Sequence, residues 1–315
     1  MKVVLGTDHL GIEFVEQLRD TFPDTQFTLA ITHDEMVQEA AGAEVFLGWP
    51  TQEVFLAGSD LKWVHCIGTG VDNLGALSAI ANAGTTLTNA RGPHTEPMAD
   101  QTMLFILSLA HNAKQMLEDQ ANGVWDTAAY DHVEVAGSRM GLYGFGMIGR
   151  AIARRALGFG MQVTAVDPGP DDDVPGVDVW DTDRLDDLVR ISDWLVVACP
   201  LTSETTMSVT SSQIGLLKPT ASLIVISRGG IVDESALGNA LVSGSIKGVA
   251  LDATKPEPPS SDSPFWGHPN AIISSHSSAQ TPEMYEGRRQ IVIENLRNYL
   301  EGKDLINRVD PVKGY

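Results

Sequence analysis

The chain has 315 residues, 43% of them hydrophobic, which leaves room for two domains with sizeable cores. Acidic residues number 41 against 21 basic ones, giving a formal net charge of −20 at pH 7. A surface of that sign repels a phosphate backbone, so nucleic-acid binding is not expected. No apolar run reaches membrane-spanning length, and the N-terminus has no signal-peptide pattern, so we expect a cytoplasmic protein.

The acidic residues are dispersed over predicted helices and loops, as at 171–173 and 186–187, and do not form a tail. Such a surface repels itself in dilute buffer. Molar salt screens the repulsion, because the Debye length then falls to about 3 Å. The composition therefore resembles that of cytoplasmic proteins from halophiles that accumulate salt. The alternative is an ordinary acidic cytosolic enzyme.

Short apolar segments alternate with amphipathic segments over the first 90 residues, a pattern that predicts a parallel sheet. Strands are expected at 2–5, 26–31, 44–47, 63–67 and 85–88, and helices near 11–21, 34–41, 52–56 and 74–82. A longer helix should begin at Thr95, with Pro97 in its first turn. Its apolar run over 98–110 predicts burial on more than one face, as expected between domains or subunits.

A glycine-rich segment follows a predicted strand near 140–143 and opens a predicted helix over 147–159. Gly144, Gly146 and Gly149 have the spacing of a dinucleotide-binding turn. In that motif the first glycine permits the tight turn and the second lets the backbone approach a pyrophosphate. The third lets the helix pack closely on the strand.

The start of this helix and the end of the next strand, 163–166, complete the predicted nucleotide site. The free amides at the helix start, at Met147 and Ile148, would face the phosphates. Asp167 follows Gly149 by 18 residues, close to the spacing of a carboxylate that binds the adenosine ribose hydroxyls. Since Asp167 disfavours a 2′-phosphate, we expect NAD as the cofactor, with NADP as the alternative.

Three polar residues follow three successive predicted strands, and each alone is typical of a surface charge or a structural histidine. Ligands bind at the carboxyl ends of the strands in an open parallel sheet, so these residues should converge. A cation, a carboxylate and an imidazole together can bind a carboxylate substrate and move a proton. They are Arg228 after 222–226, Glu257 after 248–251, and His276 after 271–274. With strands near 140–143, 163–166 and 194–198, six strands fit two mononucleotide-binding halves.

Six segments, in order, resemble the motifs of the D-isomer-specific 2-hydroxyacid dehydrogenases. They are 68–72, 144–149, 200–205, 227–234, 252–258 and 276–279. The resemblance covers nearly the whole chain and implies an α/β protein with two doubly wound parallel-sheet domains. A flavodoxin-like substrate domain, discontinuous, would take 1–92 with 281–315, the second part being a helix capped near Thr281. A Rossmann NAD(P)-binding domain would take 93–280.

Two departures from the family pattern, and one similarity to a branch of the family, concern the substrate rather than the reaction. The long interdomain helix has Ala99-Asp100 where the family often has Ala-Glu, and the loop 89–94 is richer in charge than usual. The tail 310–315 is similar to that of the glyoxylate/hydroxypyruvate reductase branch.

The resemblance implies reversible reduction of a small 2-keto acid to a D-2-hydroxy acid. His276 would be the general acid and base, Glu257 its partner, and Arg228 the substrate anchor. The family uses the backbone amides of the loop Gly68-Thr69-Gly70 for the substrate carboxylate, and Trp49 either lines the substrate pocket or is a core aromatic. On the cofactor side the implied residues are Ser227 and Asp252 near the nicotinamide, with Pro200, Thr202 and Thr205 beside the adenosine and phosphates.

Two other functions remain open on the same fold. Formate dehydrogenases resemble this chain but have Gln at the position of Glu257, and nucleotide-sensing corepressors can keep the catalytic residues. We expect a homodimer through 98–110 and 125–135, as in the family. Cys66 and Cys199 are expected to be buried free thiols, and the scattered histidines indicate no functional metal.

Overall fold

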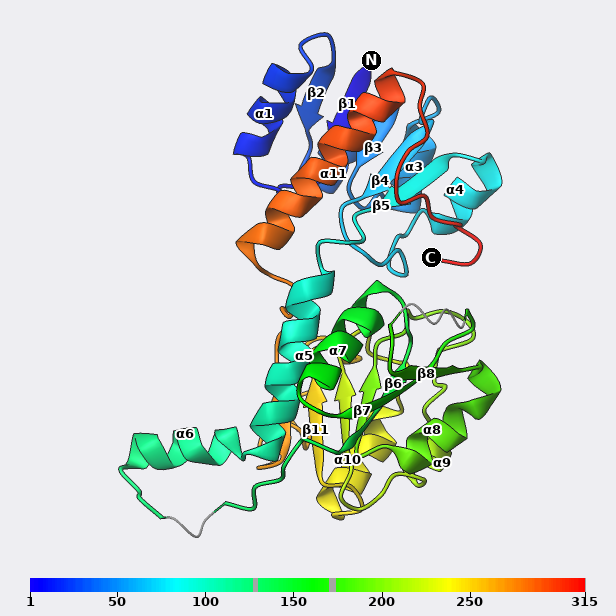
Figure 1. Cartoon of the computed structure of the whole chain (residues 1–315). Coiled ribbons are helices and arrows are strands. Elements are labelled where there is room, and N and C mark those ends of the chain that lie inside the picture. Colours follow the sequence, from blue (N-terminus) through cyan, green and yellow to red (C-terminus); the bar gives the residue numbers. More distant parts are fainter. Residues whose placement is uncertain (127–129, 170–173, 315) are drawn as a thin grey trace. The chain divides into compact units, whose positions relative to one another are not determined.

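The computed structural model describes residues 1–126, 130–169 and 174–314 (Figure 1). The chain divides into two compact units. Unit 1 consists of Met1–His94 with Gln280–Tyr315, and unit 2 is Thr95–Ala279. Every strand pairing in the two sheets of the described residues is parallel, and helices connect most of the successive strands, so the predicted class of two doubly wound α/β domains is confirmed.

Unit 1 has a sheet with the strand order β2-β1-β3-β4-β5 in the described part of the chain. Its strands are β1 (Lys2–Leu5), β2 (Gln26–Leu29), β3 (Val45–Leu47), β4 (Trp63–Cys66) and β5 (Thr86–Asn89). Its helices are α1 (Glu13–Thr21), α2 (His33–Ala40), α3 (Gln52–Ala57), α4 (Leu77–Ala83) and α11 (Pro282–Leu300).

The helices of unit 1 cover both faces of its sheet because side chains alternate along each strand. Val3 and Leu5 of β1 share one core with apolar residues of α1 and α11. Val4, between them, belongs to a second core with residues of α3 and α4. The predicted cap of α11 is confirmed, since the Thr281 side chain accepts a hydrogen bond from the backbone amide of Met284.

Unit 2 has a sheet with the order β12-β11-β10-β9-β6-β7-β8 in the described residues. Its strands are β6 (Arg139–Tyr143), β7 (Gln162–Val166), β8 (Val177–Trp180), β9 (Trp194–Val197), β10 (Ser222–Val225), β11 (Gly248–Leu251) and β12 (Ala271–Ile273). Its helices are α5 (Thr95–Ala110), α6 (Ala113–Asn122), α7 (Met147–Gly158), α8 (Leu185–Ile191), α9 (Ser211–Ile214) and α10 (Glu234–Val242), with a 3₁₀ turn, η1 (Thr182–Arg184).

Strand β8 is a correction to the six strands that the sequence predicted for unit 2. It pairs with β7 alone, at the edge of the sheet. An edge strand needs only one buried side, and here only Val177 is buried while Asp178 is exposed. The short segment Val-Asp-Val-Trp therefore lacks the continuous apolar run that identified the buried strands.

Helix α5 packs on α7 and on β10, β11 and β12 of its own unit. Its buried positions, among them Met98, Phe105 and Ile106, form one broad face, while Leu104 is 55% exposed. The sequence predicts burial of this helix on more than one face. In the single chain only one broad face is buried, and Leu104 lies outside it, exposed to solvent. Figure 1 shows α6 extending from the end of α5 away from the sheet of unit 2.

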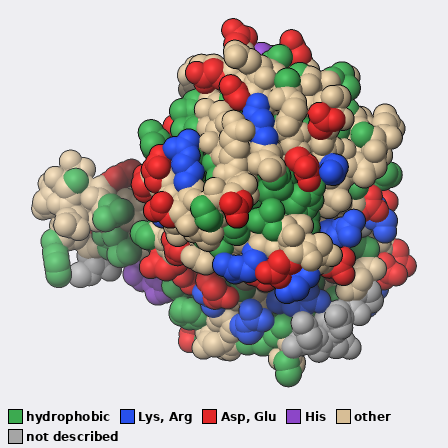
Figure 2. All heavy atoms as spheres, turned by 90° about the horizontal axis from the view of Figure 1, so that it is seen from above, with side chains coloured by type: hydrophobic (Ala, Val, Ile, Leu, Met, Phe, Trp, Pro, Cys, Tyr) green, Lys and Arg blue, Asp and Glu red, His purple; other side chains and the backbone are tan. Residues whose placement is uncertain are grey.

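The surface carries the acidic residues that the composition indicated. Figure 2 shows Asp and Glu side chains scattered over the visible face of the molecule, without a single acidic patch. None of the helices in the described part of the chain combines the length and apolar content needed to cross a bilayer.

Candidate active site

Arg228, Glu257 and His276 leave the carboxyl ends of the adjacent parallel strands β10, β11 and β12, and the structure brings the three side chains together. The His276 ring places Nδ1 at 3.0 Å from Oε2 and 3.1 Å from Oε1 of Glu257. On the other side of the ring, Nε2 lies 3.4 Å from Nη1 of Arg228. The convergence expected from the strand ends is therefore observed.

Asp252 fixes the backbone that carries His276. This side chain is 2% exposed, and its Oδ1 accepts hydrogen bonds from Ser274 Oγ at 2.5 Å and from the Ser277 amide at 3.0 Å. The His276 amide donates to the Asp252 carbonyl at 2.9 Å. His276 has φ of 51°, in the left-handed region that non-glycine residues seldom adopt. These hydrogen bonds hold that conformation, and with it the direction of the imidazole.

The resemblance to the family had placed Asp252 only beside the nicotinamide, and its contacts with the His276 segment went unpredicted. One signal in the sequence could have indicated these contacts. Asp252 ends a buried strand, and four serines lie between 274 and 278. A buried carboxylate needs several donors, and serine hydroxyls and loop amides supply them.

The loops that carry Arg228 and Glu257 are in direct backbone contact. A Cβ on Gly229 would overlap the carbonyl of Thr254 and lie 2.6 Å from the amide nitrogen of Lys255. Glu234 accepts a hydrogen bond from the same Lys255 amide at 2.7 Å. Glu257 in turn accepts from the Thr254 amide at 3.1 Å. The two loops are thus joined at one point, and only glycine allows that closeness at 229.

Glu234 has an unusual titration for a carboxyl group. Burial raises its pKa to about 7, against the lowering effect of hydrogen bonds from the Lys255 and Gly230 amides, and the nearby Glu257 raises it further. Glu234 therefore changes charge near neutral pH beside the residue that pairs with His276. The sequence motif 227–234 contains Glu234, but nothing in its spacing identified this contact.

The glycine-rich turn fits a dinucleotide. Gly144 has φ of +103°, and a Cβ there would lie 2.5 Å from the Cys199 amide nitrogen. A Cβ on Gly149 would overlap the Gly144 carbonyl oxygen, whereas one on Gly146 would meet nothing within 4 Å. Gly144 and Gly149 are therefore required by the turn itself. Gly146 instead leaves open space at the start of α7.

Helix α7 begins at Met147 with no side-chain cap from Gly146. The first amides of the helix, at Met147 and Ile148, are thus left for another acceptor, and the positive end of the helix dipole favours an anion there. Open space and uncapped amides in one place are what a bound pyrophosphate requires.

Asp167 lies directly beside the glycine-rich turn. Its Oδ2 accepts from the Phe145 amide at 2.7 Å, and its Oδ1 accepts from the Gly169 amide at 3.0 Å. Each carboxylate oxygen keeps further acceptor capacity. The predicted contact with the ribose hydroxyls is compatible with this position and remains a prediction.

The remaining residues expected on the cofactor side shape the loops after β9 and β10. Thr205 Oγ1 donates to the Pro200 carbonyl at 2.6 Å and accepts from the Thr202 amide at 2.8 Å. Ser227 Oγ donates to the Val197 carbonyl at 3.3 Å. The structure thus gives these hydroxyls partners within the protein, and their contacts with a cofactor stay predictions.

The loop Gly68-Thr69-Gly70 follows β4 in unit 1. Trp49, after β3, packs on this loop, since a Cβ on Gly68 would lie 3.1 Å from the indole ring. Trp49 is partly buried and also touches both apolar cores of unit 1. The Thr69 carbonyl accepts a hydrogen bond from Asn89 Nδ2 at 2.7 Å. Trp49 therefore combines a core contact with a position beside the predicted substrate loop.

Cys66 and Cys199 are buried free thiols, as predicted. Burial raises the pKa of both thiols to about 12, so neither is a thiolate near neutral pH. Within the described ranges, no three His, Cys, Asp or Glu side chains are grouped as a metal site would require.

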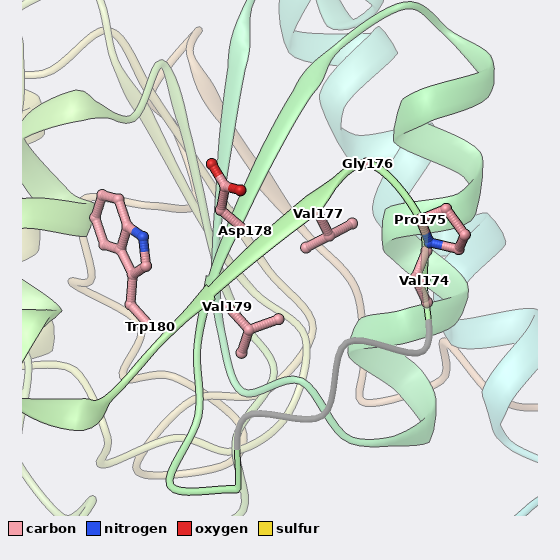
Figure 3. Close-up of a pocket in the computed structure, with 7 residues that line it drawn as sticks. All are labelled: Val174, Pro175, Gly176, Val177, Asp178, Val179 and Trp180. Atoms are coloured by element: carbon pink, nitrogen blue, oxygen red, sulfur yellow. The ribbon is translucent and has the colours of Figure 1, made fainter.

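An open hollow lies along the edge strand β8, and the carbonyl of its residue Trp180 accepts a hydrogen bond from the Asp167 amide at 3.1 Å. It is lined by residues 174–180, and Figure 3 shows Asp178 and Trp180 among them. The segment 170–173, directly before it, lies outside the described residues, so the acidic run predicted there is not placed.

Comparison with known proteins agrees with the fold and the motifs. The family model for the D-isomer specific 2-hydroxyacid dehydrogenase, NAD binding domain, matches residues 103–278. The chain is 32% identical to a hydroxypyruvate reductase of Thermotoga maritima over 247 residues, which are 78% of each protein. It is also similar to the solved structure of the TT0316 protein from Thermus thermophilus, with a TM-score of 0.85 and 28% identity over 98% of this chain and all of that one.

The chain belongs to the D-isomer-specific 2-hydroxyacid dehydrogenase family. A D-3-phosphoglycerate dehydrogenase of Methanocaldococcus jannaschii is 30% identical over 308 residues, which are 96% of this chain but 58% of that protein. The chain thus spans between about half and three fifths of the length of several curated relatives that it matches.

Proposed function

We propose that the protein is an NAD(P)-dependent D-2-hydroxyacid dehydrogenase that reversibly reduces a small 2-keto acid. The observation that carries the proposal is the contact of His276 with both Glu257 and Arg228 at the ends of three adjacent strands. Membership of the family and the fit of the glycine-rich turn to a dinucleotide support the same reaction.

The proton chemistry is assigned to His276. A ring whose Nδ1–H donates to Glu257 keeps Nε2 for the substrate, and Glu257 stabilises the positive charge of the protonated ring. Arg228 lies on the Nε2 side, where its planar guanidinium can hold the substrate carboxylate and keto oxygen. NADH, when bound, supplies the hydride. In reduction Nε2–H then gives its proton to the keto oxygen, and in oxidation Nε2 takes it back.

The experiment that tests this function is an assay of several 2-keto acids with NADH and with NADPH. A dehydrogenase should oxidise the coenzyme with at least one of them. The alternative, a nucleotide-sensing corepressor-like protein, should bind NADH with negligible turnover. Turnover of NAD with formate, and with no hydroxy acid, would indicate the formate dehydrogenase branch instead.

Coenzyme choice is assigned to Asp167. Its carboxylate lies at the glycine-rich turn and would accept hydrogen bonds from the ribose hydroxyls while repelling a 2′-phosphate. Replacing Asp167 with Ala should therefore raise the kcat/KM for NADPH relative to NADH. Steady-state kinetics with both coenzymes, at one salt concentration, would check this. A wild-type protein that already prefers NADPH at every salt concentration would contradict it.

We also infer that the protein is adapted to high salt. With a net charge of −20, the folded state should lose stability as ionic strength falls, because the dispersed acids repel one another. The melting temperature should fall when the KCl concentration is lowered below roughly 0.5 M, because the Debye length then exceeds about 4 Å. A melting series up to several molar KCl measures this. A melting temperature that is unchanged or falls as KCl is added would mean that the acidic surface is not an adaptation to salt. The protein would then be an ordinary acidic enzyme. We propose a cytoplasmic location in either case.

We infer a homodimer from the apolar surface around α5 and α6. An apolar hollow lined partly by Leu117, Trp266 and Ile272 lies there, and Leu117 is 68% exposed in the single chain. Trp125 is 93% exposed, and residues 127–129 of the predicted interface segment lie outside the described residues. Exposed apolar area of this kind is typical of subunit interfaces. Light scattering at micromolar protein in molar salt should give twice the 33.8 kDa chain mass, and a monomer would contradict the inference.

A further inference from the structure

Glu234 is the first residue of helix α10 in unit 2, and the start of that helix is fixed. The Asp233 side chain caps it by accepting from the Ala236 amide at 2.9 Å, and the Asp233 amide donates to the Val209 carbonyl at 2.9 Å. A carboxylate in a first turn usually faces solvent and interacts with the helix dipole. Glu234 is instead partly buried and extends to the loop after β11, where it accepts a hydrogen bond from the Lys255 amide.

Two successive amides of that loop donate to two different carboxyl groups. The Thr254 amide donates to Glu257 Oε1 at 3.1 Å. The next amide, that of Lys255, donates to Glu234 Oε1 at 2.7 Å. Glu257 Oε2 in turn lies 3.0 Å from Nδ1 of His276. The peptide that joins residues 254 and 255 is therefore tied to α10, while the amide just before it orients Glu257. A rotation of this peptide would move the Glu257 side chain relative to the imidazole.

The same carboxyl group joins the loop after β10 to the loop after β11. Glu234 accepts from the Gly230 amide of the first loop as well as from the Lys255 amide of the second. The contact of Gly229 with the Thr254 carbonyl limits how closely these loops can approach. A directed hydrogen bond limits how far they can separate. Packing and hydrogen bond together therefore fix the position of the 254–255 peptide.

The oxygen atoms of Glu234, rather than its charge, make this contact. Burial, with the nearby Glu257, raises the pKa of Glu234 to about 7, against the lowering effect of the Lys255 and Gly230 amides and of the Lys255 side chain. The group is thus partly protonated near neutral pH. A carboxyl group accepts amide hydrogen bonds in both its neutral and its ionised form. The two loops can therefore stay joined while the charge of Glu234 changes.

We propose that Glu234 is a positioning residue for the reaction: as a hydrogen-bond acceptor it fixes the 254–255 peptide, and thereby keeps Glu257 paired with His276. The inference rests on the proposed function, in which that pair holds and moves the proton. Glu234 acts through the loop and through Glu257, not on the reacting atoms.

The kinetic test compares Glu234→Ala with Glu234→Gln. The alanine variant should lower kcat about tenfold or more, since a displacement of about 1 Å in an active site can cost about 100-fold. The KM for the keto acid should change less, because Arg228, the proposed substrate anchor, follows β10 and not β11. Glutamine keeps an acceptor oxygen at the same length and should keep kcat near wild type. Glu283→Ala is the matched control, because Glu283 is an exposed residue in the first turn of the capped helix α11.

A measurement without substrate separates this proposal from the reaction itself. An NMR titration of histidine-labelled protein would follow the His276 ring, whose signal is identified by its absence in His276→Ala. A carboxylate beside an imidazole favours the protonated ring, so losing the partner should move the His276 titration to lower pH, by about one unit. That shift is expected in Glu234→Ala and in the reference variant Glu257→Gln. Glu234→Gln and Glu283→Ala should titrate as wild type does.

The kinetic pH profile should change in the same direction. The protonated ring is the acid in reduction, so the alkaline decline of kcat should begin at lower pH in Glu234→Ala. If that variant does not fold, Glu234→Leu takes its place, since leucine fills the space and accepts no hydrogen bond.

Three outcomes would overturn the proposal. One is an unchanged His276 titration in Glu234→Ala. Another is an equal shift in Glu234→Ala and Glu234→Gln, which would mean that the charge of Glu234 acts through space. The third is a lower melting temperature with unchanged kcat, which would make the contact purely structural. A wild type that reduces no 2-keto acid would instead refute the proposed function, and the NMR titration would still show whether Glu234 holds Glu257 beside His276.

Discussion

Replacing His276 with alanine should lower turnover of 2-keto acids at least about 100-fold, the usual contribution of a general acid or base. The ring is held by Glu257 on one side and faces Arg228 on the other. NADH binding should persist, because the glycine-rich turn is unchanged. Steady-state kinetics would measure the first effect, and a fluorescence titration with NADH the second.

The control for this variant is His268→Ala. His268 lies in the same unit, and its Nδ1 accepts a hydrogen bond from the Asn270 amide, away from the three site residues. Its loss should leave turnover near the wild-type value. Near-normal turnover in the His276 variant would show that the proton comes from another group and that the histidine is structural.

Replacing Gly229 with alanine should damage the enzyme without removing any functional group. The added Cβ would overlap the Thr254 carbonyl and lie 2.6 Å from the Lys255 nitrogen, and both are backbone atoms that cannot rotate away. Overpacking of this kind costs about 1–3 kcal/mol of stability. It would also separate Arg228 from Glu257, and a displacement of about 1 Å in an active site can cost about 100-fold in rate.

Gly267→Ala is the matched control, since Gly267 lies in a loop of the same unit and a Cβ there meets nothing within 4 Å. The melting temperature and kcat of Gly267→Ala should stay near the wild-type values, whereas both should be lower in Gly229→Ala. Equal values for the two variants would mean that the loops can separate without consequence, and that their contact does not position the site.

The sequence predicted those features that follow from local pattern. Apolar strands alternating with helices indicated two parallel sheets. Parallel strands end on one edge, so the order of Arg228 and His276 in the chain was enough to place them together. The edge strand β8 was missed because Asp178 interrupts its apolar pattern.

The contacts behind the site were not predictable, because they join residues far apart in the chain. Glu234 meets Lys255 across 21 residues, and Arg288 meets His94 across 194. No spacing rule relates such pairs, and each partner alone is typical of a surface charge. Only the packing of one loop or helix on another reveals that these polar groups are buried and what they bind.

The division of unit 1 into two chain segments has a consequence during synthesis. Helix α11 supplies Val292, Ile293 and Leu296 to one core of unit 1, yet the ribosome makes these residues after the whole of unit 2. At about 5–20 residues per second, the 185 residues from Thr95 to Ala279 delay that helix by roughly 10–40 s. Throughout that time α1 alone packs on the core that contains Val3 and Leu5, and the apolar surface that α11 later covers stays accessible to chaperones.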